Sequence, residues 1–271
     1  ILTADPRIVK NPKKIKKIMH GELRDLTYSG FSILHKDVIL PLSEKGIKTE
    51  IKSTINFPES GTLTVNERKS EEIILAVTGV KDFCILQIWK NGLNNINYIT
   101  SDILNILKKN KIPVEHISTG IDDVSIILEK KCLNKIKNAE LEIRKKIDGQ
   151  TKAKIKIKKN IGLLCVSGKG MRGAIGILSQ ITSVLAQSDI NIISINQHSS
   201  ERNIIFFIKD EDLEKRMILW LLYKDFSLLL HKKWQSLKPK SRAIDSNESY
   251  DKTIQEIISR IKKRIEYSNK L

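Results

Sequence analysis

The sequence predicts a mixed α/β (α+β) fold in which an internal duplication gives two βαββαβ units behind a partial α/β segment. The duplication is indicated by two similar apolar runs, Ile74–Gly79 and Leu163–Gly168, each ending in small polar residues. Such runs are typical of buried strands that enter a loop. Each is followed by a helical pattern and then by further strands, so we expect two copies of one unit.

A helix with one apolar face is expected in each unit. Its apolar positions are Ile99, Ile103, Ile106 and Leu107 in the first unit, and Ile177, Ile181, Val184 and Leu185 in the second. Both sets suit packing on a sheet, because helical spacing places them on one side of the helix. A polar turn then opens a strand at Lys111–Glu115 and at Asp189–Ile193.

A pair of strands and a second helix complete each unit. The expected strands are His116–Thr119 with Val124–Leu128, and Ile195–His198 with Asn203–Ile208; the helices are Leu133–Ile147 and Leu213–Tyr223. This order of elements is that of a ferredoxin-like unit. The first unit carries a further strand, Phe83–Trp89, before its helix. Thr151–Lys158 alternates Lys with small or apolar residues and suits an edge strand with one wet face.

The ends of the chain differ from these units. Near the N-terminus, helices are expected over Glu22–Phe31 and Ile33–Lys45, with a short strand at Thr49–Ser53. This is α/β material without a whole domain, and residue 1 is Ile, so we interpret the start as a cut through a longer chain. An apolar stripe predicts a helix over Tyr250–Leu271. The expected divisions are 1–68 for the α/β segment, 69–150 and 151–237 for the two units, and 238–271 for a polar linker and the last helix.

Composition excludes several function classes. No apolar run approaches the roughly 18 residues that a membrane span needs, so a cytoplasmic protein is expected. Cys84, Cys132 and Cys165 lie far apart, which favours free thiols over disulfides or zinc. The net charge of +17 raises nucleic acid as a partner, but aromatic residues make up only 5% of the chain. Lysine used as a surface residue explains the charge better, and neither nucleic acid nor membrane is expected as a partner.

The segment Ser167–Gly173 lies between a strand and a helix, where backbone N–H groups favour an anion. It lacks the G-x-x-x-x-G-K-[ST] arrangement of a nucleotide loop. A free amino acid is the better ligand, because its carboxylate suits the helix start and its ammonium can meet strand carbonyls or the Asn191 amide. The alternative is that the glycines only allow the loop to turn.

Other polar residues give weaker indications. Asp122 and Asp123 are adjacent in a strand turn, so their side chains point apart and a catalytic pair is not expected. Turn chemistry is the favoured interpretation, with contact to a basic effector as the alternative. The five histidines show no metal-ligand spacing and no nucleophile partner; they are His20, His35, His116, His198 and His231. No catalytic residue and no metal site are assigned.

Several motifs together resemble those of aspartate kinases. Ile1–Val9 (ILTADPRIV) resembles a segment near the nucleotide site of the amino-acid kinase fold, and Glu22–His35 resembles the helix that ends in Gly-x-x-Val-Leu-His. Lys52–Thr54 and Pro58–Leu63 fit the stretch that follows. The remaining matches are to the regulatory half: Val166–Gly176 and Asp189–Phe206 resemble the second ACT domain, and Gly120–Ser125 resembles a strand turn of the monofunctional, lysine-pathway subgroup.

The resemblance implies the end of an amino-acid kinase domain followed by two ACT domains, in an enzyme that phosphorylates the β-carboxylate of aspartate with ATP and magnesium. The family's Lys-Phe-Gly-Gly-Thr-Ser segment has no counterpart here, so the chain is expected to be inactive alone. Asp5, Pro6 and Arg7 fall on an ATP-side remnant. Ser32 stands where some members carry a nucleotide-contacting lysine.

The resemblance further implies effector pockets in both ACT domains and a homodimer. The first set is Tyr98, Ile99, Val114, Glu115, Gly120 and Asp122, and the second set is Met171, Ile175, Asn191, Ile192 and Gln197. An acidic residue near the ligand favours lysine over threonine. The alternatives are a stand-alone ACT sensor, which would not need Ile1–Leu63, and an RNA-binding module, which would need an aromatic pattern that Ile204–Ile208 lacks. An intact short kinase would need a glycine-rich phosphate site that the sequence does not contain.

Overall fold

The computed structural model describes residues 1–6, 12–30, 34, 36–55, 57–69, 72–93, 98–148 and 152–213. All of them belong to one compact unit, Ile1–Ser227, and a second unit, Leu228–Leu271, lies outside them. The expected helix at Tyr250–Leu271, the expected helix at Leu213–Tyr223 beyond its first residue, Arg7, Ser32 and the boundary at residues 150 and 151 also lie outside the described residues. The divisions drawn at that boundary and at 237 therefore stay predictions.

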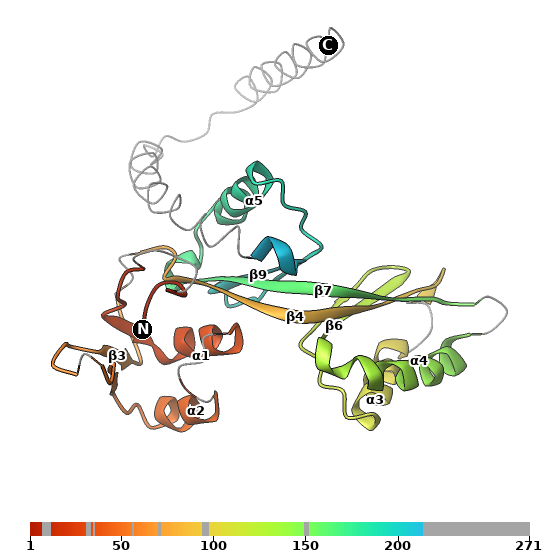
Figure 1. Cartoon of the computed structure of the whole chain (residues 1–271), viewed down its shortest axis with the longest axis horizontal. Helices are drawn as coiled ribbons and strands as arrows, with labels where there is room; N and C mark the ends of the chain where they lie inside the picture. Colours follow the sequence, from red (N-terminus) through yellow and green to blue (C-terminus); the bar gives the residue numbers. More distant parts are fainter. Residues whose placement is uncertain are drawn as a thin grey trace, which may run out of the picture. The chain divides into compact units, whose positions relative to one another are not determined.

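A six-stranded antiparallel sheet organises most of the compact unit (Figure 1). Its strand order is β5-β6-β4-β7-β9-β8. The bounds are β4 Ala76–Trp89, β5 His116–Thr119, β6 Asp123–Glu129, β7 Lys154–Ser167, β8 Ser194–Gln197 and β9 Asn203–Lys209. The mixed α/β class predicted from the sequence is therefore confirmed.

The strands β4 and β7 are each 14 residues long and pair with one another along their length. Phe83–Trp89 of β4 also pairs with β6, whereas Ile161–Ser167 of β7 also pairs with β9. The sheet thus consists of two four-stranded parts that share two strands. We call the part containing β5 and β6 the first half-sheet, and the part containing β8 and β9 the second half-sheet.

The long strands correct one prediction. The sequence placed Ile74–Gly79 as the first strand of the first unit and Phe83–Trp89 as an additional strand. They are one strand, and its beginning, Ala76–Val80, pairs with Leu163–Ser167 in the second half-sheet. Apolar patterning identifies a strand but not its partners, which explains the error. Lys154–Lys158 pairs on one side with β4, and pairing of β7 with β9 starts only at Ile161, so this stretch lies at an edge as predicted. It is not a separate strand, however, because it continues into Leu163–Ser167 as β7.

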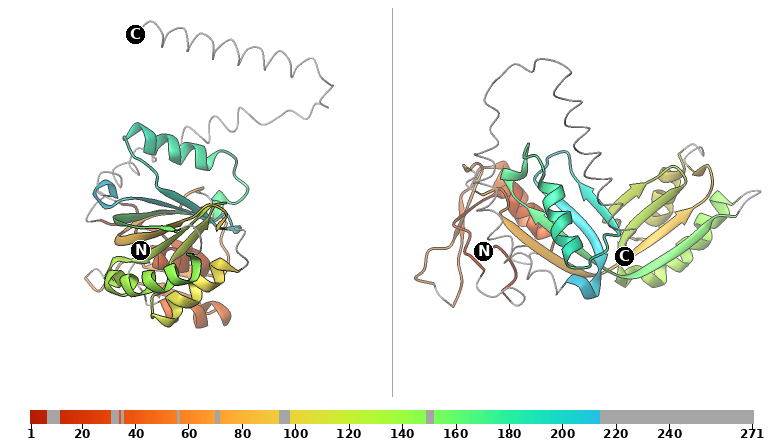
Figure 2. Two further views of the ribbon diagram at one scale, coloured as in Figure 1. Left: turned by 90° about the vertical axis from the view of Figure 1, so that its right-hand side faces the viewer. Right: turned by 90° about the horizontal axis from the view of Figure 1, so that it is seen from above.

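Helices cover opposite sides of the two half-sheets (Figures 1 and 2). The helices α3 (Ile99–Lys109) and α4 (Leu133–Ile147) pack on the first half-sheet around Leu86, and α5 (Ile177–Gln187) packs on the second around Phe206. The faces turned away from these helices carry Ile85 and Phe207, which belong to one shared buried cluster. This follows from the alternation of side chains along a strand, because Cys84 and Leu86 face the helices while Ile85 faces the other way.

The N-terminal segment is a small α/β layer that packs against the beginning of β4. It contains a three-stranded sheet in the order β1-β3-β2 and two helices, of which α1 follows β1 directly. The bounds are β1 Lys17–Met19, α1 His20–Tyr28, α2 Lys36–Glu44, β2 Thr49–Ile51 and β3 Thr62–Val65. Its apolar core, around Ile18 and Leu26, includes Leu75 and Ala76. This segment therefore shares a core with the strand that enters the large sheet.

Burial matches the expectation for the thiols. Cys84, Cys132 and Cys165 are all free and buried. Burial raises the pKa of Cys84 to about 11 and that of Cys165 to about 12, so both remain protonated at neutral pH. Among the described helices, none combines the length and hydropathy that crossing a membrane would require.

Candidate functional site

The loop after β7 is held in place by close backbone packing. A Cβ on Gly168 would lie 2.4 Å from the carbonyl oxygen of Ile73, so glycine is required for this approach. A short 3-10 helix, η3 (Lys169–Met171), follows, and Met171 is buried in the core of the second half-sheet. Gly176 then adopts a φ of +85° and caps the start of α5. We call residues 168–173 the effector loop, after the ligand site that the sequence predicts there.

Two backbone donors of the effector loop bind carboxylates of the chain itself. The Lys169 N–H donates to Oε1 of Glu22 at 2.8 Å, and the Gly173 N–H donates to Oε2 of Glu201 at 2.6 Å. The Gly168 N–H donates to the carbonyl oxygen of Arg202 at 2.8 Å. In this structure these two N–H groups are thus engaged by carboxylates of the chain itself, one from α1 and one from the turn between β8 and β9, and the predicted contact with the carboxylate of a free amino acid stays a prediction.

The predicted second pocket is partly buried and partly open. Met171 and Ile192 both pack in the core of the second half-sheet. Ile175 is 81% exposed, and Asn191 and Gln197 are also exposed. The structure thus places two of the five residues together in the core, while the other three present their side chains to solvent near the same half-sheet.

The predicted first pocket surrounds the start of α3 and the turn between β5 and β6. Ile99 is buried and Val114 packs on the same core, whereas Tyr98 is 83% exposed with a left-handed φ of 62°. The Glu115 N–H donates to the carbonyl oxygen of Ile127. The Gly120 N–H donates to the carbonyl oxygen of Asp123.

Asp122 has a structural role in this region. Its Oδ1 accepts the Gly92 N–H at 2.7 Å, and its carbonyl oxygen accepts the Lys90 N–H at 2.9 Å. The carboxylate therefore fixes the turn that follows β4. The sequence favoured a role in the local strand turn, whereas this carboxylate binds a turn 30 residues away. Any contact of Asp122 with an effector would share a carboxylate that is already engaged.

The structure describes two of the three residues of the ATP-side remnant. Asp5 is half-buried, Pro6 is exposed and Arg7 lies outside the described residues. Within the described ranges, no three His, Cys, Asp or Glu side chains gather as a metal site would require.

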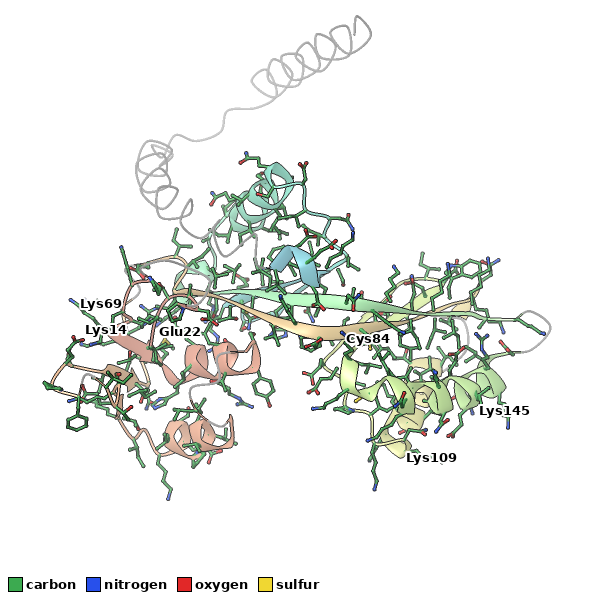
Figure 3. The ribbon with its side chains drawn as sticks, viewed as in Figure 1. Lys14, Glu22, Lys69, Cys84, Lys109 and Lys145 are labelled. Atoms are coloured by element: carbon green, nitrogen blue, oxygen red, sulfur yellow. The ribbon has the colours of Figure 1, made fainter. Side chains whose placement is uncertain are left out.

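Sequence reasoning missed a buried ion pair beside the effector loop. Glu22 on α1 is fully buried, and both of its oxygens accept hydrogen bonds from Arg68, at 2.8 and 2.9 Å (Figure 3). Burial alone would raise the pKa of Glu22, but the donors of Arg68, Met19 and Lys169 outweigh it and lower that pKa. One feature of the sequence could have indicated part of this arrangement. Glu22 is the third residue of α1 after the N-cap residue Met19, a position at which an acidic side chain commonly accepts the N–H of the N-cap residue.

A second group of missed residues lies where the edges of the two half-sheets meet. His116 of β5 and the Asn196 amide of β8 are joined by a hydrogen bond of 2.9 Å. The His116 ring lies edge-on to Phe207 and beside His198, with ring centroids 5.1 and 6.4 Å away. Burial, and then the charge of His198, lower the pKa of His116. The sequence assigned these histidines no catalytic role, and the structure gives them a packing role between half-sheets.

The α1 helix approaches this second group through Asp25. Its Oδ2 lies 3.6 Å from Nε of Arg202, which makes an ion pair but is too long for a hydrogen bond. Burial raises the pKa of Asp25, while the charges of Arg202 and His198 act against that rise. Glu22 and Asp25 are three residues apart, so one face of α1 contacts the second half-sheet at two points.

Comparison with known proteins agrees with this arrangement. A family model described as an ACT domain matches residues 164–217. Aspartokinase 3 of Bacillus subtilis is 30% identical over 228 residues, which cover 83% of this chain and 49% of that protein. The crystal structure of Clostridium acetobutylicum aspartate kinase has a TM-score of 0.74 and 36% identity, covering 79% of this chain and 49% of the other.

A third match shares the fold at lower identity. Escherichia coli aspartokinase III, solved with lysine and aspartate, is 22% identical with a TM-score of 0.66 and covers 79% of this chain and 47% of that one. The chain spans about half the length of the relatives it matches. In sequence and in fold, this chain is therefore similar to the C-terminal part of aspartokinases, with the end of an amino-acid kinase domain followed by paired ACT units.

Proposed function

We propose that this chain is the regulatory part of an aspartokinase, the enzyme class that transfers a phosphoryl group from ATP to the β-carboxylate of aspartate. The observation that carries the proposal is the extent of the similarity. The alignment with the aspartokinase of Bacillus subtilis covers 83% of this chain. A match confined to the ACT units would not explain the N-terminal segment, which packs into the same core as Leu75 and Ala76.

The regulatory ligand that we propose is a free amino acid, with lysine favoured over threonine. The effector loop supports this, because its Gly173 N–H binds the carboxylate of Glu201 at an exposed position, where the carboxylate of an amino acid could take the place of that side chain. Glu115 and Asp122 provide acidic groups in the first pocket, which suit the ammonium of a lysine side chain. The lysine complex of the E. coli enzyme gives the same indication for a protein of the same fold.

Regulation then follows from a shift between conformations. An effector inhibits the kinase only if it binds an inactive arrangement more tightly than an active one. A thousandfold preference corresponds to about 4 kcal/mol, which is enough to convert a mostly active population into a mostly inactive one. ATP and magnesium belong to the complete enzyme, as do dimerisation through the ACT units and a cytoplasmic location.

The direct test is calorimetric titration of the purified chain with lysine and, separately, with threonine. Moderate salt is needed, because the net charge of +17 would otherwise produce weak spurious binding. We expect saturable binding of lysine that is weakened by Asn191→Ala or Glu115→Ala. Asn138→Ala, an exposed residue of α4 outside both pockets, is the matched control and should bind as the parent does. Heat from neither amino acid would contradict the proposed ligand.

A further inference from the structure

Glu22 joins three segments that are far apart in the sequence. Its Oε1 accepts Nη2 of Arg68 and the backbone N–H of Lys169, each at 2.8 Å. Its Oε2 accepts Nε of Arg68 at 2.9 Å and the N–H of Met19 at 3.0 Å. The donors come from the start of α1, from the segment after β3 and from the effector loop. A single carboxylate therefore joins the N-terminal segment to the loop at the end of the second half-sheet.

This junction has little freedom to adjust. Glu22 has no exposed side-chain surface and that of Arg68 is 10% exposed. A carboxylate buried in this way must keep its donors, because each unpaired polar group away from water is costly. A second contact reinforces the first, since Nζ of Lys169 donates to the carbonyl oxygen of Arg68 at 3.2 Å.

We infer that Glu22 is a positioning residue that couples the effector loop to helix α1, so that a ligand which rearranges the loop also moves the N-terminal segment. The inference rests on the proposed function for the identity of the ligand. The contact itself does not depend on it. Lys169 lies two residues before Met171 of the second predicted pocket, so the donor to Glu22 and the pocket share one short loop.

The coupling between the effector loop and α1 follows from their direct contact through Glu22. If the loop shifts, the Lys169 N–H cannot keep its contact with Glu22 unless α1 shifts too. Tightly packed contacts of this kind change between discrete arrangements instead of deforming gradually. Asp25, one turn further along α1, meets Arg202 of the second half-sheet, and it extends the same contact face.

The test uses two substitutions at one position. Lys169→Pro removes the N–H and puts the ring Cδ in place of the amide hydrogen, where it would collide with Oε1 of Glu22, so the contact cannot form. Proline suits this position because Lys169 begins η3 and Gly168 is extended with ψ of 137°. Lys169→Ala is the matched control, because it removes the side chain but keeps the N–H.

Hydrogen exchange of the full chain, with and without lysine, is the measurement. Without ligand, we expect the α1 amides of Arg24–Tyr28 to exchange about tenfold or more faster in Lys169→Pro than in Lys169→Ala. With lysine, their exchange should change in the parent and in Lys169→Ala but not in Lys169→Pro. Calorimetry on the same samples establishes whether lysine is bound.

Several outcomes would overturn the inference. One is equal α1 exchange in the two ligand-free variants, and another is a lysine response of α1 that persists in Lys169→Pro. A rise in exchange that extends equally to β6 would indicate general destabilisation instead of coupling. If the parent binds no lysine, the proposed ligand is wrong, while the ligand-free comparison still decides the coupling. Should Lys169→Pro not fold, Glu22→Asp keeps the charge but shortens the reach, and the same α1 response is expected.

Discussion

At the scale of single residues, the polar groups that matter most are buried between elements. Glu22 stays ionised because Arg68 and two backbone donors surround it. His116 stays neutral at pH 7 because burial lowers its pKa and its ring contacts Phe207. Both residues hold two parts of the molecule together.

His116 gives a pH prediction. In the unfolded chain its pKa is about 6.5, whereas in the folded chain it is lower. The unfolded state therefore binds more protons in this range, and stability falls as the pH drops below about 6.5 toward the folded pKa. We expect His116→Gln to reduce the difference in urea midpoint between about pH 7.5 and about pH 5.5.

The pH dependence of the His116→Gln variant must be compared with that of the parent, because a second buried group also titrates with folding. The raised pKa of Asp25 acts in the opposite direction, because its folded state binds the proton more tightly. Since Asp25 is the same in both proteins, the change in pH dependence belongs to His116. Equal pH dependence in parent and variant would show that His116 does not contribute.

At the scale of elements, the bend of the two long strands decides how the half-sheets meet. The pairing of β4 with β7 slips between Val80 and Phe83 and again between Phe83 and Ile85. Asp82 and Asn160 lie at these slips, with φ of 69° and 57°. Left-handed backbone is tolerated by Asp and Asn far better than by branched residues. These bulges redirect both strands, so that Ile85 and Phe207 enter one cluster.

Asn160 is therefore expected to resist β-branched substitution. Asn160→Val should lower the free energy of unfolding by about 1–2 kcal/mol, because valine strongly disfavours the left-handed region. Asn160→Gly, which adopts this region freely, should be tolerated. Urea unfolding of the parent and both variants provides the comparison. If valine and glycine had equal effects, the conformation of this residue would not be the cause.

The bulge at Asp82 explains why the sequence did not predict β4 as a single strand, whereas other elements could be predicted. The helices at Ile99, Leu133 and Ile177 follow from their apolar periodicity, and the duplication follows from the likeness of Ile74–Gly79 to Leu163–Gly168. The polar residues at Lys81 and Asp82 interrupt the apolar pattern, so one bent strand reads as two. The contact of Glu22 with Lys169 spans a large separation along the chain, and no local pattern encodes such a contact. Of the predicted pocket residues, only those that also build the core, Ile99 and Met171 among them, have positions that periodicity could fix.

At the scale of the compact unit, the two half-sheets depend on each other because they share β4 and β7. Loss of the second half-sheet would remove strand partners and one wall of the cluster around Ile85 and Phe207. Such an arrangement favours one cooperative unfolding transition over two independent ones. It also allows an effector bound to either unit to influence the other through the shared strands.

Phe206→Ala tests this dependence. Phe206 is fully buried in β9, so its truncation should cost about 3–5 kcal/mol. If the half-sheets unfold together, hydrogen exchange of the most protected amides should rise by the same factor in β6 of the first half-sheet as in β9. Leu86→Ala, in the core of the first half-sheet, should produce the reciprocal effect on β9. Protection that persists in β6 while β9 opens would mean that the two ACT units unfold separately, and that the shared strands connect them without making them one cooperative body.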